Sequence, residues 1–237
     1  MTAQKVARTA DAVGEPFTGF PPEGLAFLTE LGRQDKAWFD ERRGIYQELV
    51  VGPAKAFVTA IGDGLAASIA PDIVALPKAN GSMAPINNDL RFTPDKPPYK
   101  DHLLLRFWEG PDKQTAPTLF VRVGESSLGF ATGARFADQM TWRERVDDDR
   151  TGAQLADALT ALAKGRALDI DGQGYKKVPK PYAEDHPRAD LLRHKGGFQA
   201  RWSEPAPKAM GSAKLVAYCL RRLEACGDVH RWLVTNL

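Results

Sequence analysis

The sequence has little cysteine, no long apolar run and almost no net charge, and each of these shortages excludes a class of protein. Its 32 basic and 30 acidic residues leave a formal charge of +2. That balance excludes a strongly basic nucleic-acid coat protein, although it allows a local basic patch. No apolar run approaches the roughly 20 residues that a membrane-spanning helix needs, and residues 1–17 lack the apolar segment of a secretory signal. We therefore expect a cytoplasmic protein that does not contact a membrane.

The only cysteines, Cys219 and Cys226, lie two helical turns apart in a segment with helical spacing. Their Cα atoms would be about 10 Å apart, which is too far for a disulfide. Two reduced, structural thiols fit the cytoplasm. The acidic run at residues 147–149 stands at the predicted end of a helix, where consecutive side chains point in different directions, so we expect no metal site there.

Several common catalytic motifs are also missing. The sequence has no Walker-type glycine loop, no Gly-x-Gly-x-x-Gly, no Gly-x-Ser-x-Gly and no His-Glu-x-x-His. These absences argue against the common kinases, dinucleotide enzymes, hydrolases and zinc proteases, and we expect no cofactor. They leave open an enzyme of another kind.

Along the chain, a block of helical patterns is followed by a block of strand patterns and then by mainly helical patterns. Helical spacing near the N-terminus is followed by strand patterns at residues 102–108, 118–123 and 127–131. Helical patterns return at residues 134–146, 154–164, 187–194 and 212–225 and in a last helix to residue 237, with short strands at 167–170 and, at an edge, 197–202. Antiparallel strands need no crossover helices, so this order predicts an α+β fold with a central antiparallel sheet of about three to five strands flanked by N-terminal and C-terminal helices. We expect residues 1–17 to be a disordered lead-in and residues 18–237 to form a single α+β domain.

Three further details are expected within this fold. A helix should begin near residue 35 with Asp35 as its N-cap and stop before Gly52-Pro53, where another helix begins. The hairpin of residues 118–131 should turn at Gly124-Glu125-Ser126. Alternation along its first strand places Arg122 on the face opposite the aliphatic side chains.

The densest charge lies at residues 89–102, where three prolines favour a rigid, extended backbone. One interpretation is an anion site, in which cations converge on a phosphate or carboxylate and acids position them. The cations are Arg91, Lys96 and Lys100, and the acids are Asp89, Asp95 and Asp101. The alternative is an internal lattice of salt bridges packed over Phe92 and Tyr99.

A second segment, residues 175–187, repeats the combination of lysine, tyrosine, proline and acid and ends in Asp185-His186-Pro187. It would close over the first segment and contribute Lys177 and Lys180 to a basic, tyrosine-lined cleft. His186 would then transfer protons, since its unperturbed pKa lies near neutrality. In the structural alternative, Asp185 caps a helix that begins at Pro187. The basic residues that follow, at positions 188–201, are expected to be solvated, so a nucleic-acid partner is not favoured.

Three blocks of sequence resemble the conserved bacterial and fungal proteins grouped as domain of unknown function 2461. They are Phe27-Leu28-x-Glu30-Leu31 with Trp38-Phe39-Asp40 and Tyr46, Asp89-Leu90-Arg91-Phe92-Thr93-x-Asp95-Lys96-x-Pro98-Tyr99-Lys100, and Lys177-x-Pro179-Lys180 with Asp185-His186-Pro187. The resemblance implies a shared fold and no particular reaction. It is incomplete, because Asn88 stands where the family core has arginine and Pro85 where another arginine is common. Losing two guanidinium groups weakens the anion site or implies a different ligand.

We therefore predict that the two charged segments meet around a cleft that binds a phosphate- or carboxylate-bearing small molecule or a nucleotide. If the protein is an enzyme, His102 or His186 transfers the proton, Tyr99 acts as a donor, and the reaction is hydrolysis or group transfer. The alternative is a non-catalytic protein-interaction module in which the charged segments are structural. The sequence leaves the reaction and the oligomeric state open.

Overall fold

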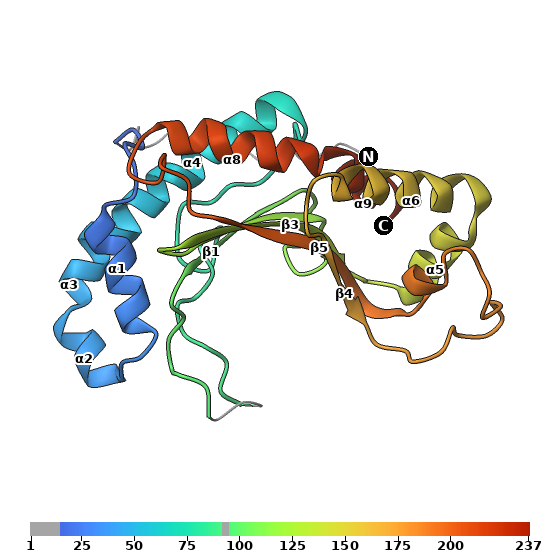
Figure 1. Ribbon diagram of the computed structural model, residues 1–237, viewed down its shortest axis with the longest axis horizontal. Helices are drawn as coiled ribbons and strands as arrows, with labels where there is room; N and C mark the ends of the chain where they lie inside the picture. Colours follow the sequence, from blue (N-terminus) through green and yellow to red (C-terminus); the bar gives the residue numbers. More distant parts are fainter. Residues whose placement is uncertain (1–14, 92–94) are drawn as a thin grey trace.

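A computed structural model describes residues 15–91 and 95–237 (Figure 1). Most of the predicted N-terminal lead-in, residues 1–17, lies outside the described residues. Phe17 is described, and its ring packs 5.2 Å from that of Phe20 and 4.9 Å from that of Phe57. Because Phe17 is buried, the packed domain includes at least this residue of the predicted lead-in.

The centre of the fold is a five-stranded sheet in which every neighbouring pair of strands is antiparallel. The order across the sheet is β1-β2-β3-β5-β4. The strands are β1 (Leu103–Trp108), β2 (Thr118–Val123), β3 (Ser127–Arg135), β4 (Asp169–Gln173) and β5 (His194–Pro205). This sheet and its flanking helices confirm the predicted α+β class and antiparallel arrangement.

Helices cover one face of this sheet. In Figure 1, α4, α6, α8 and α9 lie on the same side of the sheet, α1 to α3 extend beyond its β1 edge, and α5 and α7 lie beside β4. The helices are α1 (Pro22–Leu31), α2 (Lys36–Glu41), α3 (Arg43–Tyr46), the π-helical turn η1 (Gln47–Val51), α4 (Gly52–Ser68), α5 (Gln139–Asp147), α6 (Asp149–Ala163), α7 (Ala189–Leu192), α8 (Lys214–Ala225) and α9 (Gly227–Asn236). No helix in the described part of the chain covers the opposite face.

Alternation along the strands decides which side chains meet the helices. Leu119, Val121 and Val123 of β2 are buried beneath them, whereas Phe120 and Arg122 point to the uncovered face. The predicted orientation of Arg122 is therefore confirmed.

The chain continues as helix through the predicted break at Gly52-Pro53. Asp35 caps α2 as expected, accepting the Trp38 N–H at 2.9 Å. However, the π turn η1 joins α3 to α4, and the Gly52 N–H reaches the Gln47 carbonyl. Proline has no N–H and usually interrupts an α-helix. Here the wider π-helical turn before Pro53 allows the helix to continue although Pro53 donates no backbone hydrogen bond.

The helical stretch Arg43–Ser68 is the one described helix that is long and apolar enough to cross a membrane, by length and composition. This finding differs from the sequence expectation that no segment approaches that length. Its apolar residues Phe57, Ile61 and Leu65 are fully buried in the core of the domain. This face of the helix is part of the hydrophobic core.

Two other predicted segments differ from the structure. The predicted helix 134–146 is wrong at its start, because β3 continues to Arg135 and α5 begins only after Asp138, whose carboxylate accepts the Met140 and Thr141 N–H groups at 3.0 Å. The predicted edge strand 197–202 belongs to β5, which lies between β3 and β4. In both segments, hydrogen bonds between distant parts of the chain outweigh local propensity.

Gly133 of β3 provides a test of how closely the strands are packed. A Cβ atom there would lie 2.3 Å from the carbonyl oxygen of Phe198 on β5. We expect Gly133→Ala to lower the free energy of unfolding by about 1–3 kcal/mol, because the strands must separate locally. Urea denaturation measures the change.

Gly196→Ala is the matched control within the same sheet. No heavy atom lies within 4 Å of the Cβ that this substitution would add, so we expect a change within about 0.5 kcal/mol. Equal destabilisation by the two variants would contradict the packing argument.

Candidate functional site

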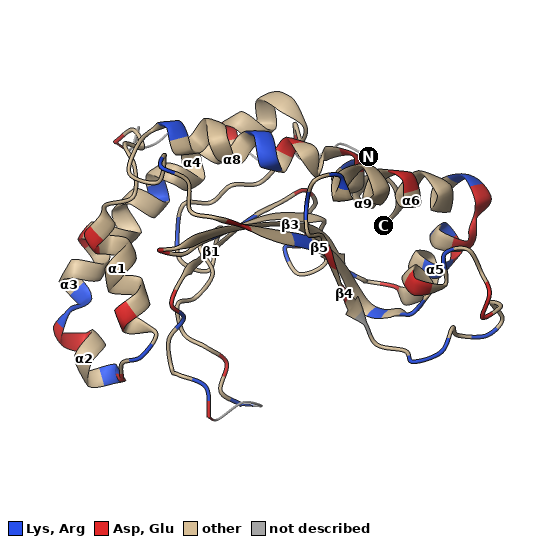
Figure 2. Ribbon diagram, in the orientation of Figure 1, with Lys and Arg blue, Asp and Glu red and all other residues tan. Residues whose placement is uncertain are grey.

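The two charged segments predicted to meet lie at opposite edges of the sheet (Figures 1 and 2). The first forms part of an extended arm, residues 84–101, which leads into the edge strand β1. Residues 92–94 of this arm lie outside the described residues, and with them the predicted packing of Phe92. The second segment, residues 174–187, is the loop that follows β4, the other edge strand. Blue and red alternate along the described arm in Figure 2, so acids and bases lie close together there.

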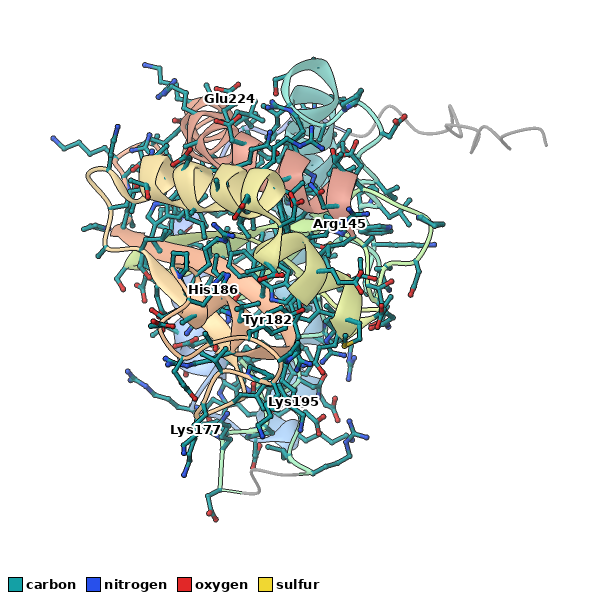
Figure 3. The ribbon with its side chains drawn as sticks, turned by 90° about the vertical axis from the view of Figure 1, so that its right-hand side faces the viewer. Arg145, Lys177, Tyr182, His186, Lys195 and Glu224 are labelled. Atoms are coloured by element: carbon teal, nitrogen blue, oxygen red, sulfur yellow. The ribbon has the colours of Figure 1, made fainter. Side chains whose placement is uncertain are left out.

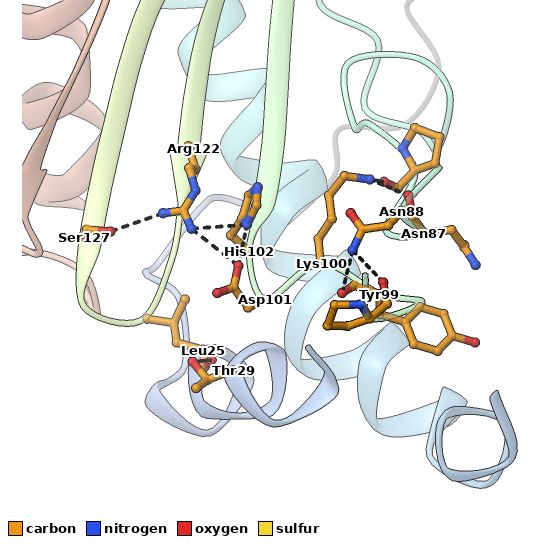
Figure 4. A network of polar contacts seen from close by, with 12 residues as sticks. Leu25, Thr29, Asn87, Asn88, Tyr99, Lys100, Asp101, His102, Arg122 and Ser127 are labelled. Atoms are coloured by element: carbon orange, nitrogen blue, oxygen red, sulfur yellow. Dashed lines mark hydrogen bonds and ion pairs between the residues drawn. The ribbon is translucent and has the colours of Figure 1, made fainter. Parts of the chain in front are cut away.

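Asn88 holds the two sides of the arm together (Figure 4). Its side-chain amide donates to the carbonyls of Pro97 at 2.8 Å and Tyr99 at 3.0 Å, and its backbone N–H donates to Pro98 at 2.9 Å. The residue that replaces the usual arginine therefore acts as a bridge between backbone segments.

Lys100 and Tyr99 are also occupied within the arm. The Lys100 ammonium donates to the carbonyls of Pro85, at 2.6 Å, and Asn87, and partial burial lowers the pKa of this lysine. Tyr99 is buried, and its ring packs 4.9 Å from that of Phe39. Both residues hold the arm in place.

The remaining charges of the arm are partly paired. Arg91 forms a bidentate pair with Asp89, with an Nη2–Oδ2 distance of 2.7 Å and an Nε–Oδ1 distance of 3.0 Å. Arg91 donates hydrogen bonds to Asp89 from its side chain and from its backbone, and these bonds lower the pKa of Asp89 to about 2. Asp95 and Lys96 are exposed, and neither forms an ion pair with another residue in the described ranges.

His102 belongs to a polar network at the base of the arm (Figure 4). Its Nδ1 lies 2.6 Å from Oδ1 of Asp101 and 3.2 Å from Nη2 of Arg122, and Arg122 also donates to Ser127 at 3.2 Å. Burial lowers the pKa of His102, against the opposing effect of the Asp101 carboxylate. Asp101 orients the imidazole, a geometry that permits proton transfer at Nε2.

His186 has partners at both ring nitrogens. Its Nδ1 accepts the backbone N–H of Arg188 at 3.0 Å, and its Nε2 lies 3.2 Å from Oδ1 of Asp147 on α5. The structural alternative, in which Asp185 caps the following helix, is wrong: α7 begins at Ala189 without a side-chain cap, and the imidazole meets the free N–H instead. Asp185 is exposed.

Lys177 and Lys180 are exposed on the loop. Figure 3 shows Lys177 on the same side of the molecule as Tyr182 and Lys195. Neither loop lysine forms an ion pair with another described residue. They lie far along the sheet from the arm, at its β4 edge (Figure 1).

A groove of about 1030 Å³ lies on the uncovered face of the sheet. We call it the open-face groove. Its lining spans all five strands and includes Phe120 on β2, Gly133 on β3, and Gly172 and Gly197 on β4 and β5. The glycines have no side chains to fill the space above the strands, and this leaves the groove deep at these positions.

Cations outnumber acids around the open-face groove. Arg106, Lys113 and Arg135 line it, together with a single acid, Asp171. Asp171 is already paired with Arg201 at 3.1 Å. The lining therefore carries an excess of positive charge, which suits an anionic ligand.

The three cations differ in how they are held. Arg106 donates to the carbonyl of Gly81 at 3.2 Å, and partial burial lowers its pKa. Lys113 donates to the carbonyl of Asn80. Arg135, at the end of β3, is exposed and forms no ion pair with any described residue. It is therefore the cation of the groove best placed to meet a ligand.

Sequence reasoning missed all three cations. Arg106 lies within the apolar run read as a buried strand, and Lys113 and Arg135 stand in no conspicuous motif. The alternation that placed Arg122 correctly also applies to Arg106 on the neighbouring strand. It could therefore have predicted that Arg106 lies on the uncovered face. Among the described residues, no group of three His, Cys, Asp or Glu side chains is placed to hold a metal ion.

A family model described as conserved hypothetical protein, DUF2461, matches residues 23–232. The chain belongs to the DUF2461 family. The resemblance read from the sequence is thus confirmed, over almost the whole described domain. No curated protein matches the sequence. Since the description of DUF2461 gives no activity, function must be argued from the geometry of the site.

His194, beside the groove at the start of β5, predicts a pH dependence of stability. Its buried ring donates from Nδ1 to the Leu191 carbonyl at 3.0 Å, and Nε2 is buried without a described partner. Burial lowers its pKa below the unfolded value, outweighing the bonds to nearby carbonyls. As pH falls below about 6.5, the unfolded chain binds the proton more readily than the fold does, so stability decreases.

We expect His194→Gln to reduce this loss between pH 7 and pH 5, measured by urea denaturation at each pH. One proton accounts for at most about 1.4 kcal/mol per pH unit. Some slope should remain, since burial also lowers the pKa of His102 and His230. Parallel curves for the variant and the wild type would assign the dependence to other groups.

Proposed function

We propose that this DUF2461 protein binds a small molecule carrying phosphate or carboxylate, such as a nucleotide, in the open-face groove. The observation that supports this most directly is the positive excess of the groove: Arg106, Lys113 and Arg135 against one acid that is paired elsewhere. The half-buried ring of Phe120 in the lining adds an apolar surface against which a ring could lie.

This proposal differs from the cleft expected from the sequence. Tyr99, Lys100 and His186 have structural partners, and Arg91 is paired with Asp89. None of the three candidate catalytic residues, Tyr99, His102 and His186, lines the groove. The proposed activity is accordingly binding, and catalysis is not part of it.

We also propose that the protein acts in the cytoplasm. Cys219 and Cys226 are free and buried, and burial raises the pKa of each thiol to about 12. Thiols of this kind remain protonated and unreactive, which is consistent with a reducing compartment.

The interaction-module hypothesis remains the second candidate, because Asp89 pairs with Arg91 and Lys100 binds backbone carbonyls within the arm, as that hypothesis requires. A screen separates the two candidates. Thermal-shift measurements against nucleoside monophosphates, sugar phosphates and dicarboxylates should reveal a ligand that raises Tm with concentration. If no compound in the panel raises Tm, the result would favour the interaction module.

Arg135→Met tests where such a ligand binds. A hydrogen bond to a charged group contributes about 1.5–3 kcal/mol, so we expect at least about tenfold weaker binding by isothermal titration calorimetry. Because Arg135 is exposed, Tm without ligand should change little.

Lys96→Met is the matched control, since it removes one exposed cation from the arm and does not touch the groove. We expect its ligand affinity to equal that of the wild type. If Lys96→Met loses binding and Arg135→Met binds normally, the ligand binds at the arm and not in the groove.

A further inference from the structure

Arg143 of α5 is a buried cation without an acidic partner. Only 9% of its surface is exposed, and it forms no ion pair with any described residue. Its Nε is buried without a hydrogen-bond partner among the described residues, and Nη1 lies 3.9 Å from the sulfur of Met140. Asp147, one turn later on the helix, pairs with His186 instead. Burying an unpaired charge is strongly unfavourable, so this guanidinium is poised for an anion from outside.

Tyr175 lies against this guanidinium. The centre of its ring is 5.1 Å from Cζ of Arg143 and 5.8 Å from Nζ of Lys195. Its hydroxyl lies 3.4 Å from Oε1 of Gln139, and hydrogen bonds to Gln139 and Arg143, with the charges of Arg143 and Lys195, lower the pKa of the phenol. The ring of one tyrosine thus lies close to two cations, and neither cation forms an ion pair with a described residue.

None of these three side chains lines the open-face groove itself, but Lys195 adjoins residues that do. Lys195 immediately precedes Gly196 and Gly197 of β5, and both glycines line the groove. A Cβ at Gly174 would lie 2.6 Å from the Cβ of Lys195. Glycine at this position therefore lets the loop pass closely over Lys195, and the next residue in the loop is Tyr175. Figure 3 shows Lys195 on the side of the molecule below α5.

We propose that Arg143, Tyr175 and Lys195 form an oxyanion subsite at the α5 end of the open-face groove. The subsite takes a terminal phosphate or carboxylate, while the groove holds the rest of the ligand. The inference rests on the proposed function and deepens it by assigning one terminal anionic group to residues beyond the groove lining, in addition to the contact that Arg135 makes with the ligand. An arginine fork, an ammonium and a phenol hydroxyl together supply the donors that such a group requires.

Inorganic phosphate is the probe, because it presents the anion without the body of a ligand. Calorimetry at low ionic strength gives its affinity, and the ¹⁵N–¹H resonance of Arg143 Nε reports its location. We expect phosphate to shift this resonance in the wild type. Tyr175→Phe and Lys195→Met should each weaken phosphate binding by about tenfold, since each removes a charge-assisted contact.

Arg135→Met separates this inference from the proposed function. Phosphate affinity should stay within about twofold in this variant, while a larger groove ligand binds at least about tenfold more weakly. Absence of phosphate binding in the wild type, or unchanged phosphate affinity in Tyr175→Phe and Lys195→Met, overturns the subsite. The groove proposal stands or falls separately, on the larger ligand and Arg135.

Arg143→Met distinguishes a ligand-binding cation from a structural one. We expect phosphate binding to be lost while Tm stays the same or rises, because replacing an unpaired buried charge with an apolar chain removes its desolvation cost. Arg145→Met is the matched control: it is exposed on the same helix, and it should alter neither quantity. A lower Tm with unchanged phosphate affinity in Arg143→Met would make Arg143 structural and contradict the proposal. Should this variant not fold, Tyr175→Phe and Lys195→Met decide the question.

Discussion

The functional surfaces of this protein depend on a sheet that is covered by helices on one face only. Side chains alternate along each strand, so burying Val121 and Val123 under the helices places Arg122 between them on the open face. Arg106 and Phe120 of the groove owe their orientation to the same alternation. The glycines at positions 133 and 197 then decide how deep the space above the strands is. An uncovered face lined by small residues and cations is unusual for a packed domain, which is why it is the natural place for a ligand.

Charge behaves differently in dense and in sparse regions of this sequence. In the arm, an acid and a base two residues apart, Asp89 and Arg91, find one another at almost no cost in loop closure. An acid and a base this close in a dense charged run can therefore pair with each other. Arg135 and Arg143 stand in segments that pair their acids elsewhere, as Asp147 does with His186. Neither Arg135 nor Arg143 forms an ion pair with a described residue, and a search for dense charge clusters does not find them.

Local signals in the sequence predicted much of the fold. The cap at Asp35, the hairpin around Gly124 and the orientation of Arg122 each depend on residues close together in the chain, and the structure has all three. The DUF2461 resemblance could also be recognised from the sequence, because its central block is compositionally unusual. Two of the predictions that failed concern pairing between distant parts of the chain. The interior position of β5 and the continuation of β3 to Arg135 come from hydrogen bonds between strands more than sixty residues apart.

The sequence analysis and the proposed subsite both involve the loop of residues 174–187, but through different residues. His186 and Arg188 fasten one end of residues 174–187 to α5, with Arg188 donating to the carbonyls of Val146 at 2.6 Å and Asp147 at 2.8 Å. At the other end, Gly174 packs on Lys195. A loop held at both ends keeps Tyr175 in a defined place over Arg143, with little conformational entropy left to lose when a ligand arrives. Under the proposed subsite, His186 is a positioning residue for the loop. Lys177 and Lys180 are exposed to solvent on its outer surface.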